Sequence, residues 1–217
     1  MICDEHCDGY IKSLIPDLDG YLEGIEEEAI NNRVPIIRKD MQQFLKVMLE
    51  LHKPEYLLEI GSATGFSSIY MAYCQKSLNI VTIEKDGQRA LEAEKNIENS
   101  DAFQRIRLIH ADACEALVNL GMEKKQFDMV FMDAAKGQYG KFLELILKNN
   151  LLRKGGLLIT DNILQEGSVA WSKFTIERRN RTIHMRMRDY VFMLTHDDRF
   201  ETSVISTGDG AALTVIK

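Results

Sequence analysis

The sequence predicts an α/β protein with a doubly wound, mostly parallel sheet of seven strands, N-terminal helices and a C-terminal antiparallel hairpin. Strand-like and helix-like segments alternate between residues 56 and 160. The strand-like segments are mainly apolar and contain β-branched residues, which indicates parallel strands covered on both faces. A short Gly-containing turn separates the last two apolar runs, 200–206 and 211–216, and this favours a hairpin.

The N-terminal quarter of the chain is expected to be helical. Apolar residues recur at helical spacing over residues 10–32. Pro16 is expected to separate a short helix from a longer one, because proline is tolerated in the first turn of a helix but not in its interior. Residues 39–52 have the pattern of a second amphipathic helix, which leads into the first strand.

The rest of the chain alternates between the two kinds of element. An amphipathic helix is expected to open after Gly65, and no repeat or linker interrupts the chain. We therefore expect a single domain, 1–217, in which residues 1–52 form a helical cap and residues 53–217 the core. The expected strands are 56–60, 80–84, 106–109, 127–132 and 157–160, and the expected helices between them are 86–99, 113–121 and 138–147.

Composition places the chain among ordinary globular proteins. Its 217 residues are 45% hydrophobic and 28% charged. No apolar run approaches the roughly 20 residues that span a bilayer, and the first residues lack the apolar core of a signal peptide. The four cysteines are scattered, which favours reduced thiols. We therefore expect a cytoplasmic protein without a membrane partner.

The charge of the chain is unevenly distributed. A formal net charge of −6 argues against a general nucleic-acid-binding protein. Residues 173–188, however, contain six basic residues and one acidic residue. Such a segment is either the solvated face of a helix or a surface that contacts phosphate groups. The basic residues are Lys173, Arg178, Arg179, Arg181, Arg186 and Arg188, and the acidic residue is Glu177.

The loop after the first expected strand has the features of a ligand-binding turn. Glu59 lies near the end of the strand, and a Gly-x-x-x-Gly loop follows from Gly61 to Gly65. The Gly-x-Gly-x-x-Gly fingerprint of dinucleotide-binding proteins is absent. An acid followed by this loop suits a charged amine and a ribose better than a pyrophosphate, which indicates S-adenosylmethionine. The alternative is a Gly-containing turn that binds no ligand.

Polar residues end each of the expected parallel strands, where open α/β sheets bind their ligands. Glu84 follows Gly65 by 19 residues, a spacing at which an acid can accept hydrogen bonds from both ribose hydroxyls. Asp112 and Ala113 end the third strand, within reach of an adenine amino group. A single acid at a strand end is commonly the N-cap of a helix, but a series of such ends favours a binding site.

Two further strand ends bring hard oxygen ligands together. Asp133 ends one strand, and Asp161 and Asn162 end the next. Their oxygen atoms suit Mg²⁺; the alternative is an N-cap aspartate and an Asx turn. Lys136 lies three residues beyond Asp133. A lysine beside a divalent cation loses its proton more readily, so Lys136 is a candidate general base, or else a solvated lysine at a helix start.

Three of these motifs together resemble the metal-dependent, catechol-type O-methyltransferases. They are residues 58–67, the Asp-Ala-Ala-Lys of 133–136 and the Asp-Asn of 161–162, and the resemblance runs over nearly the whole chain. It implies the Rossmann-like fold of class I methyltransferases, a homodimer, a catalytic role for Asp133 and Lys136, and Mg²⁺ bound by Asp133, Asp161 and Asn162. The residues expected to bind S-adenosylmethionine are Ile37, Glu59, Gly61, Ser67, Glu84, Asp112, Ala113 and Asp133.

Within the family, residues 34–37 and 133–139 resemble the bacterial enzymes that methylate 5-hydroxyuridine at the wobble position of tRNA. This resemblance implies that the anticodon loop of tRNA is the partner, and the basic residues of 173–188 favour that substrate over a small phenol. Two alternatives remain open. One is an O-methyltransferase of small catechols or phenols, and the other is a nucleotide-binding regulatory domain without enzymatic activity.

Overall fold

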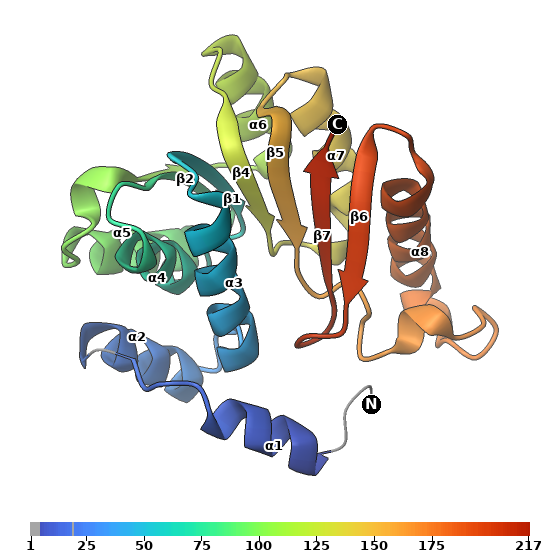
Figure 1. Cartoon of the computed structure of the whole chain (residues 1–217), viewed down its shortest axis with the longest axis horizontal. Coiled ribbons are helices and arrows are strands. Elements are labelled where there is room, and N and C mark those ends of the chain that lie inside the picture. The colour runs from blue at the N-terminus through green and yellow to red at the C-terminus, as the bar shows by residue number, and fades with distance from the viewer. Residues whose placement is uncertain (1–4, 19) are drawn as a thin grey trace. The chain divides into compact units, whose positions relative to one another are not determined.

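The computed structural model describes residues 5–18 and 20–217. The chain divides into two compact units, which meet in the sequence between Asp112 and Ala113. Each unit contributes strands with helices packed on them (Figure 1). In the part of the chain that is described, no helix combines the length and the hydropathy needed to cross a membrane.

The first unit, which ends at Asp112, contains three parallel strands. Its central strand, β2, pairs with β1 on one side and with β3 on the other. The register places Glu59 opposite Thr82 and Glu84 opposite His110. The strands are β1 (Tyr56–Ile60), β2 (Asn79–Glu84) and β3 (Ile106–His110), and the helices are α1 (Glu5–Ser13), α2 (Gly20–Asn31), α3 (Lys39–His52), α4 (Phe66–Cys74) and α5 (Gly87–Glu98).

The second unit, Ala113–Lys217, contains four strands and a mixed pairing pattern. β5 pairs in parallel with β4 and antiparallel with β7, and β7 continues the antiparallel pairing with β6. Helix α8 packs against β6 and α7 (Figure 1). The strands are β4 (Phe127–Met132), β5 (Leu152–Thr160), β6 (Phe200–Ile205) and β7 (Ala211–Ile216), and the α-helices are α6 (Ala113–Met122), α7 (Tyr139–Lys148) and α8 (Arg181–His196).

The strand order is β3-β2-β1-β4-β5-β7-β6, which makes a seven-stranded mixed sheet. The predicted fold class is therefore confirmed, including the antiparallel hairpin at the C-terminus. The burial of β4 on both faces matches its sequence, which is apolar except for Asp128. The predicted division into a helical cap and a core remains a prediction.

Three elements differ from the sequence-based expectation. β5 begins at Leu152 instead of residue 157, because a shift of register between Phe127 and Met129 of β4 lets pairing continue past the glycines. α4 is buried over Phe66–Ala72 instead of being amphipathic. α8 was not predicted as a helix, because its arginines masked the buried residues that recur at helical spacing: His184, Met187, Tyr190 and Leu194.

The turn between β6 and β7 approaches the loop after β5 very closely. A Cβ atom on Gly210 would lie 2.2 Å from the Cγ atom of Leu164, and the φ angle of Gly210 is +84°. Gly167 has a similar φ of +81°, but a Cβ atom there would meet no atom within 4 Å. The two glycines therefore share the left-handed backbone and differ in packing.

This difference predicts unequal costs for the same substitution. Gly167→Ala should lower the free energy of unfolding by about 1 kcal/mol through backbone strain alone. Gly210→Ala should add the displacement of Leu164, a further cost of about 1–3 kcal/mol. Urea unfolding of both variants measures the difference, and equal losses would contradict the close packing of this turn.

Candidate cofactor and metal sites

Glu59 is directed into the interior of the first unit. Its side chain is fully buried. The carboxylate accepts a hydrogen bond of 2.5 Å from the Thr82 hydroxyl on β2 and another from the Ser68 hydroxyl on α4. These bonds join two strands and a helix, so Glu59 stabilises the base of the loop; its contact with a cofactor remains a prediction.

Glu84 lies where the sequence analysis placed it, at the carboxyl end of β2, and it organises the loop around it. One carboxylate oxygen, Oε2, accepts a hydrogen bond of 2.9 Å from the backbone N–H of Ala63. The other, Oε1, accepts bonds from the backbone N–H groups of Lys85 (2.9 Å) and Asp86 (2.8 Å). A carboxylate has about four acceptor positions, so Glu84 retains capacity for a ligand hydroxyl.

The loop from Gly61 to Gly65 contains two buried hydroxyl groups that the sequence analysis did not single out. Within the described part of the chain, the Oγ of Ser62 and the Oγ1 of Thr64 have no hydrogen-bond partner. Both residues are buried. A buried polar atom without a partner is costly, so this loop suits a polar ligand such as S-adenosylmethionine. The sequence feature that could have predicted these groups is the presence of two hydroxyl side chains between Gly61 and Gly65.

Three more predicted cofactor residues of the first unit are placed by packing. Ile37 is buried, and its carbonyl oxygen accepts a hydrogen bond of 3.0 Å from the Gln42 side chain. Ser67 is buried in the first turn of α4. Asp112 forms an ion pair of 2.8 Å with the Lys85 ammonium. The adenine contact predicted for Asp112 remains a prediction.

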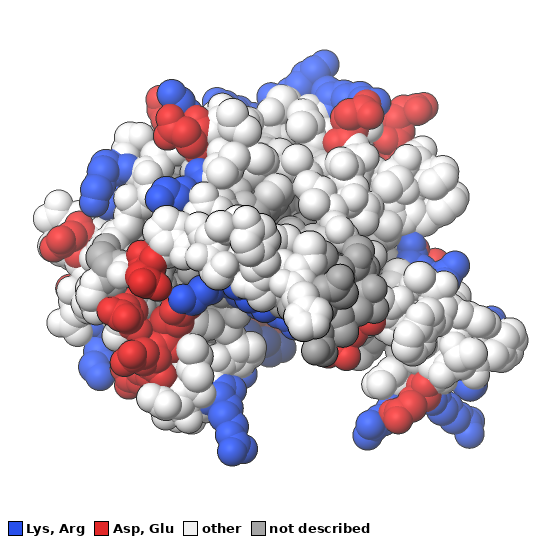
Figure 2. Space-filling view, turned by 60° about the horizontal axis from the view of Figure 1, so that its bottom comes forward, with Lys and Arg blue, Asp and Glu red and all other residues white. Residues whose placement is uncertain are grey.

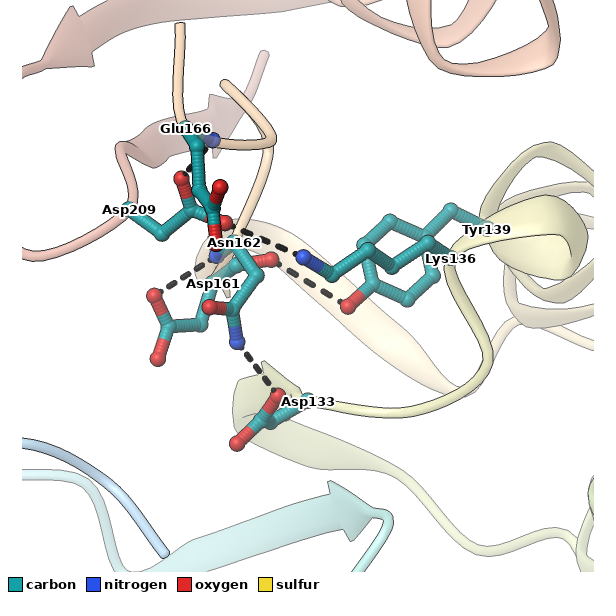
Figure 3. Close-up of polar contacts among 7 residues, drawn as sticks. All are labelled: Asp133, Lys136, Tyr139, Asp161, Asn162, Glu166 and Asp209. Carbon is teal, nitrogen blue, oxygen red and sulfur yellow. Dashed lines mark hydrogen bonds and ion pairs between the residues drawn. The ribbon is translucent and has the colours of Figure 1, made fainter. Parts of the chain in front are cut away.

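The second unit brings together the three predicted metal ligands (Figure 3). Asp133 follows β4, and Asp161 and Asn162 follow β5, its parallel neighbour. The Asn162 amide nitrogen donates to the Asp133 carboxylate at 2.8 Å. The Asp161 carboxylate accepts a bond of 2.6 Å from the backbone N–H of Asn162, whose φ angle is +60°. The two strand ends are thus linked through a residue in left-handed conformation.

The chemistry of these donors fits a hard divalent cation. Two carboxylates and one amide provide oxygen atoms, which Mg²⁺ prefers. Burial raises the pKa of the Asp133 carboxyl, against the opposing effects of the Asn162 hydrogen bond and the Lys136 charge. A cation would favour the ionised carboxylate. The described residues include no cluster of three or more His, Cys, Asp or Glu side chains suited to a metal, so the amide of Asn162 is an essential member of this set.

Lys136 has a partner that the sequence analysis did not foresee. Its ammonium forms an ion pair of 3.0 Å with Asp209, from the turn between β6 and β7 (Figure 3). Tyr139, three residues further on, donates a hydrogen bond of 3.2 Å to the backbone oxygen of Asp161. The turn between the last two strands contains Gly-Asp-Gly at residues 208–210, and its sequence predicts only a hairpin. The acidic residue between the two glycines is the sequence feature that could have indicated a partner for Lys136.

Three arginines of the basic segment 173–188 bind backbone carbonyl groups, and the other cations of the segment are exposed. Arg181 donates to the carbonyl of Ile176 at 3.0 Å. Arg188 donates to the carbonyls of Val169 (3.0 Å) and Trp171 (3.1 Å). These side chains fasten the irregular segment before α8 to the helix itself, which is an internal structural role.

The remaining cations of this segment are exposed beside exposed aromatic rings. Lys173, Arg178 and Arg179 are exposed. The exposed fraction is 56% for Trp171 and 76% for Phe174. On the face drawn in Figure 2, Lys and Arg are interspersed with Asp and Glu instead of forming one continuous patch. Any contact with an anion on that face is therefore local.

Comparisons with known proteins all match this chain to methyltransferases. The family model described as O-methyltransferase matches residues 16–217. A catechol O-methyltransferase of Niastella koreensis is 30% identical over 169 residues, which is 76% of this chain and 76% of that protein. A flavonoid 3',5'-methyltransferase of Vitis vinifera is 30% identical over 207 residues, covering 88% of this chain and 85% of that protein.

Solved structures agree with these sequence matches. A Staphylococcus aureus protein that carries the name of a caffeoyl-CoA O-methyltransferase has a TM-score of 0.87 and 29% identity, and the match covers 96% of this chain and 98% of that one. An O-methyltransferase from Bacillus cereus, solved in complex with SAH, has a TM-score of 0.84 and 25% identity, with 97% and 96% covered.

The contacts of Glu84 predict its effect on cofactor binding. Glu84→Ala removes the acceptor for ligand hydroxyls and releases the loop N–H groups, so affinity for S-adenosylmethionine should fall by about 1–3 kcal/mol. Asp86→Ala is the matched control. Asp86 caps α5 through the N–H groups of Gln88 and Arg89, so its loss should lower stability by about 1 kcal/mol and leave affinity nearly unchanged. Calorimetry that finds equal affinity in Glu84→Ala and the parent would remove Glu84 from the binding site.

Proposed function

The chain belongs to the catechol and caffeoyl-CoA type of S-adenosylmethionine-dependent O-methyltransferases, and from this premise we propose that it methylates 5-hydroxyuridine at the wobble position of tRNA. The product is 5-methoxyuridine. The prediction of an enzyme is confirmed by family membership. This membership argues against a purely regulatory nucleotide-binding domain.

In the proposed reaction, the substrate oxygen forms a bond to the methyl carbon while the bond from that carbon to sulfur breaks. S-adenosylhomocysteine leaves, and the proton of the substrate hydroxyl passes to Lys136, the candidate general base, or to solvent. In the first unit, Glu84 and the loop hydroxyls of Ser62 and Thr64 would bind the cofactor. Correct orientation of the two reactants is the main contribution expected from such a site.

In the second unit, Asp133, Asp161 and Asn162 would hold Mg²⁺. A bound Mg²⁺ would supply Lewis-acid polarisation of the substrate hydroxyl. The Asp133 and Asp161 carboxylates would provide the negative charge that balances the cation, and Asn162 would turn its amide so that the oxygen faces the site. The left-handed backbone of Asn162 favours this residue type, because Asn adopts that conformation more readily than most others.

The observation that supports RNA is the exposed segment before α8. Trp171 and Phe174 present their rings to solvent, among the exposed cations Lys173, Arg178 and Arg179. Aromatic rings that stack on bases, together with cations that contact phosphates, are typical of single-stranded RNA recognition. A pocket for a small phenol would instead bury its aromatic residues.

The second candidate is an O-methyltransferase of small catechols or related phenols. The names of the relatives from Niastella koreensis and Vitis vinifera favour it. The metal ligands serve both candidates equally, because each substrate offers a hydroxyl group to be methylated. The segment before α8 therefore distinguishes them. The expected homodimer remains a proposal carried by the resemblance.

Metal removal provides one test. Excess EDTA should abolish methyl transfer, and Mg²⁺ added afterwards should restore it. Asp161→Ala should lower turnover on the order of 100-fold or more, because a ligand to the cation is lost. Its affinity for S-adenosylmethionine, measured by calorimetry, should stay close to that of the parent. Full activity in excess EDTA is the result that would refute the metal site.

The segment before α8 provides the second test. Lys173, Arg178 and Arg179 should be replaced by Ala together, and Arg181 should be left intact because it holds the backbone of Ile176. Binding of an anticodon stem-loop should weaken. The slope of log K against log salt should fall by about 2, from a contribution of about 0.7 per phosphate contact.

The matched control replaces three exposed lysines outside this segment, Lys125, Lys141 and Lys148, with the same change in net charge. Both triple variants should methylate a small catechol at the rate of the parent. Equal RNA affinity and equal salt slope in the two variants would exclude the segment as an RNA surface and favour the small phenol as the substrate.

A further inference from the structure

Asp209 links three segments of the second unit through one buried side chain. Its carboxylate is 7% exposed, whereas the side chain of its partner Lys136 is 36% exposed. The Oδ2 atom accepts the Lys136 ammonium at 3.0 Å, and the Oδ1 atom accepts the backbone N–H of Glu166 (Figure 3). The two carboxylate oxygens thus serve two different segments.

The loop that receives the second of these bonds has an unfavourable backbone conformation. The φ angles of Gln165 and Glu166 are +49° and +56°. Such values cost non-glycine residues free energy and persist only where the surroundings fix them. Hydrogen bonds from the N–H of Leu164 to the carbonyl of Asp209 and from the N–H of Ile163 to the carbonyl of Gly210, both 2.9 Å, fix this loop to the hairpin turn.

The hairpin turn also packs closely against this loop. The close approach of Gly210 to Leu164 leaves no room for even a methyl group between them. On the other side, Arg186 of α8 donates a hydrogen bond of 3.2 Å to the carbonyl of Gly137, in the short turn that carries Lys136. Lys136 is therefore fixed at its backbone by α8 and at its ammonium by Asp209.

We propose that Asp209 is a positioning residue for methyl transfer, and that it acts through Lys136. The buried carboxylate holds the Nζ atom of Lys136 in one place before the substrate arrives. This positioning role is inferred from the ion pair between Asp209 and Lys136, and from the hydrogen bonds and close packing of the turn that carries Asp209. It rests on the proposed function only in that Lys136 takes part in the reaction.

A double-mutant cycle tests this proposal. Asp209→Asn retains an acceptor for the N–H of Glu166 and removes the charge opposite Lys136. Turnover should fall by about 10-fold or more, while the KM values of both substrates change little, because misplaced groups lower the rate of the chemical step. Lys136→Met should lower turnover at least as much. The double variant should be no slower than Lys136→Met alone, since Asp209 acts through Lys136.

Asp128→Asn is the matched control. Asp128 is also a buried aspartate of the second unit, and it forms an ion pair of 2.8 Å with Arg153. Its replacement should cost stability without changing turnover. If Asp209→Asn does not fold, as judged by thermal unfolding, Asp209→Glu takes its place in the cycle, because it keeps the charge and moves its position.

A second measurement uses no substrate, so its outcome does not depend on the proposed function. Amine-reactive labelling of the free protein, followed by mass spectrometry, should modify Lys136 several-fold faster in Asp209→Asn than in the parent. Lys85, paired with Asp112, is the internal reference and should not change. Unchanged labelling of Lys136 would overturn the proposal. So would a double variant whose loss of turnover equals the product of the two single losses, because the two residues would then act independently. A parent protein that methylates a small catechol but not an anticodon stem-loop would overturn only the proposed substrate, and the cycle would then be measured with the catechol.

Discussion

Burial of the parallel strands on both faces is the constraint on which the sites of this protein depend. β4 is buried along its whole length, and β5 is buried over its last five residues. Polar side chains cannot be accommodated within such strands without partners. They lie instead where the strands end, and because parallel neighbours end at the same edge, Asp133 and Asp161 come together. The site is a consequence of how the sheet is covered.

Hydrogen bonds to backbone groups hold both sites in place. Glu84 accepts three backbone N–H groups, and Asp209 fixes a left-handed loop that would not persist alone. In each case one buried carboxylate satisfies donors from segments that have no regular secondary structure. Hydrogen bonds of this kind hold loop residues close to one geometry, as a binding site requires.

Arginine serves two purposes in the segment before α8. Arg181 and Arg188 bind carbonyl groups and replace the backbone pairing that an irregular segment lacks. Arg178 and Arg179 remain exposed. The guanidinium group suits the first task because it carries five donors in a rigid plane. A count of basic residues therefore overstates the charge available to an anionic partner.

The sequence by itself determined the order and type of nearly all elements and the positions of the candidate ligands. This was possible because periodicity and strand ends are local features: Glu84, Asp133 and Asp161 follow directly from the apolar runs before them. The helical nature of α8 was missed, because charge dominated its pattern. Only the tertiary structure paired Lys136 with Asp209, which lies 73 residues away. The tertiary structure also showed that Glu59 is buried and that some arginines bind carbonyl groups while others are exposed. Packing, and not the local sequence pattern, decides which partners distant in sequence form hydrogen bonds.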